Sequence, residues 1–330
     1  MPRYTQLIAS LPETVPFVGA EVHERRLGRP FRARLGANES AFGPSPRAIA
    51  AMAAAAAEAW KYGDSELHDL RAALAARHGV LPANIVGGEG IDGLLGLLVR
   101  LLVAPGTPVV TSRGTYPTFN YHVAGFGGVL HTVPYRDNRP DLDALVDAAR
   151  STASPLVYLA NPDNPMGCWH SGRMIGDFLD ALPGGTLLCL DEAYADTAPP
   201  DALPAIAPDD PRVIRMRTFS KAHGLAGLRV GYAIAAPGLV QAFDRIRNHF
   251  GIGRIAQAGA LAAIGDEAHL RETVARIAAG RERLAAIARE NGLVPVPSAT
   301  NFVTMDCGRD GEFARAVVAA LAERGVFVRM

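Results

Sequence analysis

Short runs of apolar, often β-branched residues alternate along most of the chain with longer stretches rich in Ala and Leu. The short runs have the length of buried strands and predict seven of them, at residues 84–86, 108–111, 129–133, 156–159, 187–190, 213–217 and 230–234. The stretches between them, such as 94–103, 142–149 and 173–181, are long enough for covering helices. This alternation predicts an α/β fold with a mostly parallel, seven-stranded sheet covered by helices.

The pattern changes after residue 253. Two long helical segments, 255–264 and 269–290, lead into three short strand candidates at 293–296, 302–305 and 326–329. We therefore expect a large, ligand-binding domain over residues 46–253 and a small α+β domain over residues 254–330. Residues 1–45 are expected to form an N-terminal arm and part of the small domain.

Composition narrows the class of protein. Hydrophobic residues make up 49% of the 330 positions and charged residues 20%, which is typical of a globular chain with a sizeable core. The 33 basic residues balance the 33 acidic ones, so the chain has no basic field for nucleic acid. Cys168, Cys189 and Cys307 are far apart, and the nine histidines show no paired ligand spacing. These patterns predict neither a disulfide framework nor a metal site.

The same residues bear on location. The first thirty positions lack the apolar run of a signal peptide, and the most apolar later stretch, 94–103, is short and contains Arg100. The sequence therefore predicts a cytoplasmic protein without a membrane segment.

A glycine-rich segment, residues 87–93, follows the first predicted strand and runs directly into a predicted helix. Glycines at such a place let backbone N–H groups approach a phosphate at a helix N-terminus. Gly88, Gly90 and Gly93 also satisfy the dinucleotide pattern G-x-G-x-x-G, and Arg113 could hold a ribose phosphate. A phosphate cradle, an NADP site and a ligand-free tight turn all remain open at this point.

Polar residues follow the next predicted strands as well. The segment Asn161-Pro162-Asp163-Asn164-Pro165-Met166-Gly167 contains two Asn-Pro pairs, which fix an extended backbone and present an amide at the edge of the sheet. Asp191 ends a later apolar run, and Tyr194 comes three residues afterwards. A carboxylate at this place could neutralise a cationic ring nitrogen or simply cap a helix.

The last cluster follows the run at 213–217. Lys221 lies next to this strand end between hydroxyl-bearing neighbours, and Arg229 comes eight residues later. A buried lysine here could form a Schiff base beside an anion site, although a single lysine is usually a solvated surface charge. Together, a cradle, an amide, a carboxylate, a phenol and a lysine at successive strand ends suit a phosphorylated pyridine aldehyde.

These residues resemble the fold type I (class I/II) pyridoxal-phosphate-dependent aminotransferases, and within them the group similar to histidinol-phosphate aminotransferase. The resemblance extends from residues 37–46 to residues 325–329. Its most specific motifs are the lysine signature at 220–232, the loop at 161–167, which is similar to Asn-Pro-x-Asn-Pro-Thr-Gly, and Asp-Glu-Ala-Tyr at 191–194. It implies pyridoxal 5'-phosphate as the cofactor, a large and a small domain, and a homodimer with shared active sites.

The resemblance also implies roles for individual residues. Lys221 would form the Schiff base and move the proton, Asp191 would pair with the pyridine nitrogen, and Tyr194 and Asn164 would donate hydrogen bonds to the ring oxygen. The phosphate would be held by Thr218, Ser220, Arg229 and the backbone of Gly90, Ile91 and Asp92. Phe119 would stack on the ring, Tyr62 would reach the partner's cofactor phosphate, and Asn38 and Arg329 would contact substrate.

Three departures from the family pattern concern activity. Met166 replaces the usual Thr, and Gly93 replaces a common Glu, although neither position donates an essential group in these roles. The sequence stops at Met330, before the family's last strand and the arginine that grips an amino-acid carboxylate. Either the chain is shortened or carboxylate recognition is altered.

The implied reaction is transamination between histidinol phosphate and 2-oxoglutarate, with glutamate as the amino donor of the reverse direction, in histidine biosynthesis. An aromatic amino-acid aminotransferase or a phosphoamino-acid decarboxylase of the same fold is an alternative. More remote alternatives are an NADP-binding oxidoreductase and a non-catalytic cofactor-binding protein.

Overall fold

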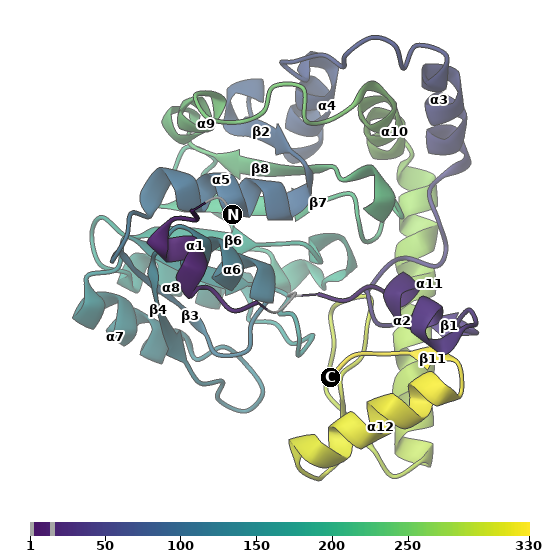
Figure 1. Cartoon of the computed structure of the whole chain (residues 1–330). Coiled ribbons are helices and arrows are strands. Elements are labelled where there is room, and N and C mark those ends of the chain that lie inside the picture. Colours follow the sequence, from purple (N-terminus) through teal and green to yellow (C-terminus); the bar gives the residue numbers. More distant parts are fainter. Residues whose placement is uncertain (1–2, 14–16) are drawn as a thin grey trace.

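The computed structural model describes residues 3–13 and 17–330 and is built around one seven-stranded sheet (Figure 1). The strand order is β2-β8-β7-β6-β5-β3-β4. The strands are β2 (Ile85–Gly88), β3 (Pro108–Ser112), β4 (Val129–Val133), β5 (Leu156–Ala160), β6 (Leu187–Asp191), β7 (Val213–Thr218) and β8 (Gly231–Ala235). β3 to β7 run parallel, whereas β8 is antiparallel to both β2 and β7. The predicted α/β fold with a mostly parallel, seven-stranded sheet is confirmed.

Helices cover both faces of this sheet. On one face lie α5 (Gly90–Leu102), α6 (Pro117–Gly125) and α9 (Pro237–Asp244), and on the other lie α7 (Leu142–Thr152) and α8 (Gly172–Ala181). Alternate strand residues serve the two faces: Tyr158 packs under α5 and α6, whereas its neighbour Leu159 packs under α7 and α8. Burial on both faces explains why the strands appear as continuous apolar runs in the sequence.

A third apolar cluster lies at the β2 edge of the sheet. There α4 (His68–His78) and α10 (Arg254–Ile264) pack on Ile85 and Ile234, and α3 (Pro46–Ala56) lies against α10. Ser45 caps the start of α3 by accepting a hydrogen bond from the backbone N–H of Ala48.

Most of the remaining elements lie beside the sheet, around the long helix α11 (Glu267–Glu290) (Figure 1). They are α2 (Ala20–Leu27), β1 (Ala33–Arg34), β9 (Val294–Pro295), β10 (Met305–Asp306), α12 (Gly311–Glu323) and β11 (Val326–Phe327). The short helix α1 (Gln6–Ser10) is separate from this group and is drawn in front of the sheet in Figure 1. β1 pairs in parallel with β11, so segments from the two ends of the chain lie side by side. β9 pairs with β10 in antiparallel fashion. The domain boundaries stay a prediction.

Within the described residues there are also four single-turn 3-10 helices, at Pro82–Asn84, Ala195–Thr197, Pro200–Ala202 and Ala226–Leu228. The first explains why β2 starts one residue later than predicted: the Asn84 side chain accepts from the Leu81 N–H and donates to two backbone carbonyls. Among the helices of the described residues, none is long and apolar enough to cross a membrane.

Candidate active site

Asp191 is the last residue of β6, and its side chain is buried at the carboxyl edge of the sheet. Oδ2 accepts a hydrogen bond from the Tyr158 hydroxyl at 2.7 Å, and Oδ1 accepts one from the Ala193 N–H at 3.0 Å. Burial raises the pKa of this carboxyl to about 6, because desolvation outweighs the two donors. A cationic group placed beside Asp191 would therefore be strongly favoured.

Lys221 follows β7, and its amine is held inside the same edge. Nζ donates to the backbone oxygen of Asn38 at 3.2 Å and lies 5.6 Å from the centroid of the Tyr194 ring. Burial lowers the lysine pKa to about 8, with help from the positive charge of Arg329, against the attraction of Asp92 and Asp191. The amine is thus easier to deprotonate than an exposed lysine, as a nucleophile or base requires.

The Tyr194 hydroxyl links three distant parts of the sequence. It accepts hydrogen bonds from the side-chain amides of Asn38 and Asn164, each at 3.3 Å. Burial raises the tyrosine pKa, so its proton is retained and can be donated. The motif residues Lys221, Asp191, Asn164 and Tyr194 therefore lie close together, and Asn38 lies with them.

A second group of predicted residues surrounds the start of α5. This helix begins at Gly90, which has φ +75°, and no side chain caps its N-terminus. A Cβ at Gly90 would collide with the Arg229 guanidinium, and one at Gly231 would lie 2.7 Å from the Gly90 carbonyl carbon. Uncapped N–H groups next to a guanidinium form an anion site.

Hydroxyl groups adjoin this anion site. Thr218 pairs with Gly231 in the sheet, and its Oγ1 donates to the Ser220 hydroxyl at 2.9 Å while accepting from the Ser220 N–H. On the other side, Arg229 Nη2 lies 3.5 Å from Asp92 Oδ2. The predicted phosphate ligands are therefore brought together around the first turn of α5.

Phe119 is not brought to this site. Its side chain has no exposed surface, and its ring stacks on Tyr158 at a centroid distance of 4.5 Å within the core under α5 and α6. The prediction that Phe119 stacks on a cofactor ring stays a prediction, and the burial of its side chain in the core weighs against it. Phe119 is the third residue of α6 and points into the sheet, a direction that the residue type alone does not reveal.

Tyr116, directly before α6, is an aromatic residue near the cradle that sequence analysis did not single out. Its hydroxyl donates to Asp92 Oδ1 at 2.8 Å, and burial, with the nearby charges of Asp92 and Asp191, raises its pKa. The half-buried side chain thus reaches the first turn of α5 through its hydroxyl. Its position at a helix start after a strand was the available signal.

Two other predicted residues lie apart from these groups in sequence. The Arg329 guanidinium stacks on Phe17 at 4.9 Å, and its charge adds to burial in lowering the pKa of Lys221 and opposes the rise in the pKa of Tyr194, so it lies near the amine. Tyr62 is 76% exposed, and its ring packs at 4.8 Å on Phe250. Its predicted role concerns a partner subunit and stays a prediction.

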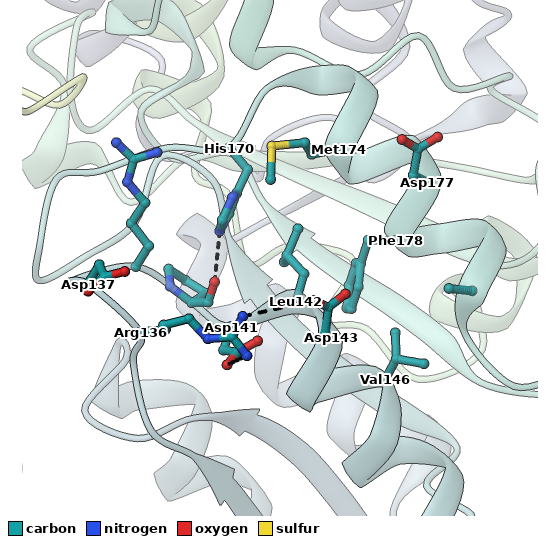
Figure 2. Close-up of a pocket in the computed structure, with 13 residues that line it drawn as sticks. Arg136, Asp137, Asp141, Leu142, Asp143, Val146, His170, Met174, Asp177 and Phe178 are labelled. Carbon is teal, nitrogen blue, oxygen red and sulfur yellow. Dashed lines mark hydrogen bonds and ion pairs between the residues drawn. The ribbon is translucent and has the colours of Figure 1, made fainter.

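A cavity of about 630 Å³ lies elsewhere, between α7, α8 and the loop before α7 (Figure 2). None of the predicted site residues lines it. His170, on its wall, donates from Nε2 to the Pro140 oxygen at 2.8 Å and from its backbone N–H to Asn161. The cavity is therefore connected through His170 to the start of the loop that carries Asn164. In the described part of the chain, no three His, Cys, Asp or Glu side chains form a group that could hold a metal ion.

Comparison with known proteins identifies the family. The pattern of the family "Aminotransferase class I and II" matches residues 33–330. A histidinol-phosphate aminotransferase of Anaeromyxobacter sp. (strain Fw109-5) is 40% identical and aligns over 100% of this chain and 91% of its own length. One of Moorella thermoacetica is 35% identical over 100% of this chain and 85% of its own.

Solved structures agree. The histidinol-phosphate aminotransferase of Sinorhizobium meliloti, in complex with pyridoxal-5'-phosphate, matches with TM-score 0.97 and 57% identity, over 100% of this chain and 89% of that one. Aspartate aminotransferase of Thermus thermophilus with maleate, at 22% identity, TM-score 0.80 and coverage of 99% and 91%, shares the fold. The family resemblance is confirmed, and the dinucleotide interpretation of Gly88, Gly90 and Gly93 gives way to it. The chain belongs to the aminotransferase class I and II family.

Proposed function

We propose that this protein transfers an amino group between histidinol phosphate and 2-oxoglutarate, with pyridoxal 5'-phosphate as cofactor. One observation carries the proposal: the buried, pKa-lowered amine of Lys221 lies with Asp191, Asn164 and Tyr194 beside an uncapped helix start. The full-length similarity to histidinol-phosphate aminotransferases supports the substrate.

The residues present fit the cofactor. Gly231 lets β8 pass close to the Gly90 backbone, and Gly90 lets the Arg229 guanidinium approach the start of α5, so that uncapped N–H groups and a guanidinium lie together where a phosphate would bind. Thr218, Ser220, Arg229 and the backbone of Gly90, Ile91 and Asp92 would hold that phosphate. When bound, the cofactor would supply an aldehyde that condenses with amines and a cationic pyridine ring that accepts electrons.

The protein side chains would then do the following work. Asp191 would stabilise the proton on the pyridine nitrogen, which also relieves the cost of burying its own charge. Asn164 and Tyr194 would donate hydrogen bonds to the ring oxygen. Lys221 Nζ would take the proton from the substrate carbon and deliver it to the cofactor, and would do the reverse when the amino group is passed on.

Ring stacking belongs to Tyr116 in this proposal. Its hydroxyl reaches Asp92 in the first turn of α5, and the charge of Asp191 contributes to raising its pKa, whereas the Phe119 side chain has no exposed surface. Arg329 and Asn38 would contact the substrate, since the guanidinium lies near Lys221 and suits an anionic group.

A homodimer is part of the proposal, because the exposed Tyr62 ring has a role only if a second subunit brings a cofactor phosphate to it. A cytoplasmic location is proposed as well. The free thiols of Cys168 and Cys189 are buried, which is compatible with a reducing compartment.

The test is a substrate panel with the cofactor-loaded protein. Histidinol phosphate with 2-oxoglutarate should give glutamate faster than any aromatic amino acid does. A preference for aromatic amino acids would favour the aromatic aminotransferase, and carbon dioxide release from a phosphoamino acid would favour the decarboxylase. Cofactor binding with no turnover of any substrate would favour a non-catalytic protein.

A further inference from the structure

Asp163 is a buried carboxylate that none of the roles above uses. It lies between the two Asn-Pro pairs, and only 1% of its surface is exposed. Oδ1 accepts a hydrogen bond from the Tyr135 hydroxyl and Oδ2 accepts one from the Met166 N–H, both at 3.0 Å. Because burying a carboxylate is costly, its presence inside this loop calls for a reason.

The carboxylate fixes the loop from within. The Asp163 N–H donates to the Cys168 oxygen at 2.8 Å, and the Gly167 N–H donates to the Asp163 oxygen at 3.1 Å. With the side-chain bond to Met166, these contacts close the turn around Asn164. The Asn164 amide reaches the Tyr194 hydroxyl at 3.3 Å, a long bond that a small shift of the loop would break.

Tyr135 extends the contact to a second loop. It follows β4, and its burial raises the pKa of its phenol, while the adjacent Thr115 hydroxyl acts in the opposite direction. Thr115 is buried and directly precedes Tyr116. The phenol of Tyr135 therefore lies between the loop that carries Asn164 and the segment that carries Tyr116.

We propose that Asp163 and Tyr135 are positioning residues, which hold these two loops at the spacing that lets Asn164 and Tyr116 contact the cofactor ring together. The inference rests on the contacts of Asn164 and Tyr116 with that ring proposed above.

The charges around Asp163 are compatible with this role. The groups that face it are the Tyr135 phenol, the Cys168 thiol and the Asp191 carboxylate. Burial raises the Asp163 pKa to about 6, and the donors from Met166 and Tyr135 oppose the rise. The side chain is therefore ionised at neutral pH, where it accepts both hydrogen bonds.

The test is the pH titration of the visible absorbance of the bound cofactor. Donors to the ring oxygen stabilise its negative charge, so a misplaced Asn164 should raise the titration midpoint. We expect Asn164→Ala, Asp163→Ala and Tyr135→Phe each to raise it, by roughly half to one pH unit. Asp163→Asn should lie within about 0.2 unit of the wild type, because the amide can accept from Met166 and donate to the Tyr135 oxygen.

Tyr232→Phe is the matched control. It removes another buried phenol, which is hydrogen-bonded to His78 at 2.8 Å and belongs to the apolar cluster under α4. It should lower thermal stability about as much as Tyr135→Phe does and leave the midpoint unchanged. Tyr135→Phe keeps the volume of the ring, so it stays informative if Asp163→Ala fails to fold.

The outcomes separate this inference from the proposed function. A shift with Asn164→Ala but none with Tyr135→Phe would overturn the positioning role and leave the site intact. No shift with Asn164→Ala would overturn the assignment of Asn164, and the positioning role with it. An added shift from Tyr135→Phe in the Asn164→Ala background no larger than about 0.2 unit would support transmission through Asn164.

Discussion

Lys221 shows how burial prepares a single residue for chemistry. Removing its amine from water lowers its pKa to about 8, so a neutral nucleophile is accessible near physiological pH. The same burial costs stability whenever the amine is protonated. The site therefore depends on a residue that destabilises the fold.

This cost has a pH signature in the apoprotein. The folded pKa of Lys221, about 8, lies below its usual value of 10.5, so the penalty is complete below pH 8 and disappears as pH rises to 10.5. Lys221→Met should therefore be more stable than the wild type at pH 7, by on the order of 2 kcal/mol, and equally stable near pH 11. Urea unfolding at both pH values measures the difference, and an equal gap at the two would contradict a buried amine.

Tyr116 and Phe119 can be distinguished by substitution. Tyr116→Ala should weaken cofactor binding about tenfold or more, because a stacked aromatic ring is worth roughly 1–2 kcal/mol. Phe119→Leu should lower the free energy of unfolding by roughly 1–2 kcal/mol and leave cofactor affinity unchanged, since it only alters the core. The reverse pattern, measured by equilibrium dialysis and urea unfolding, would favour Phe119 as the stacking residue.

Sequence motifs predicted the residues whose type is demanded by chemistry. Lys221, Asp191, Asn164 and Tyr194 follow strand ends in order, and the parallel sheet brings those ends together. The residues that the motifs did not reveal are those whose role depends on the direction of the side chain. Tyr158 carries a hydroxyl group inside an otherwise apolar strand, and its hydrogen bond to Asp191 depends on which face of the sheet the side chain occupies.

Two elements approach each other closely where β8 passes the start of α5. Gly231 in β8 lies so near the backbone of Gly90 and Ile91 that a methyl group would overlap both. The strand thereby sets the position of the N–H groups that would hold the phosphate. At this scale, glycine is required by the close approach of two backbones.

Gly231→Ala should push the cradle outward and weaken cofactor binding by about tenfold or more, at a stability cost of roughly 1–3 kcal/mol. Gly176→Ala in α8 is the control, because a methyl group there meets open space. It should raise stability by roughly 0.5–1 kcal/mol and leave affinity alone. Equal affinities for all three proteins would show that β8 does not set the cradle.

Elements of the sheet were predictable to within a residue or two, because buried strands and their covering helices leave strong apolar patterns. The short strands β9, β10 and β11 were predicted longer than they are. Only two residues of each pair with a neighbour, and such pairing depends on segments far away in the chain. The pairing of β1 with β11 had no local signal for the same reason.

At the scale of the whole molecule, three exposed aromatic side chains lie near the start of α10. Trp60 is 79% exposed, Tyr62 76% and Phe250 49%, and the last two pack on each other. Clusters of exposed aromatic side chains often mark surfaces that bind another protein. They are compatible with the proposed homodimer, in which Tyr62 would reach the partner subunit.

The wild type should therefore sediment as a dimer at micromolar concentration, and Trp60→Ser with Phe250→Ser should shift it toward monomer. The control is Phe126→Ser. Phe126 is an exposed residue at the end of α6, near β4, and this variant should remain dimeric. A wild-type monomer that binds cofactor with full affinity would contradict a shared site.

The central claim is that Lys221 and its neighbours carry out amino-group transfer on pyridoxal 5'-phosphate, and the visible spectrum of the purified protein tests it most directly. We predict an absorption band when the cofactor is supplied, its conversion to that of the amine form when glutamate is added, and no conversion in Lys221→Ala. A wild-type protein without a band, or a Lys221→Ala variant that converts as fast as the wild type, would contradict the account.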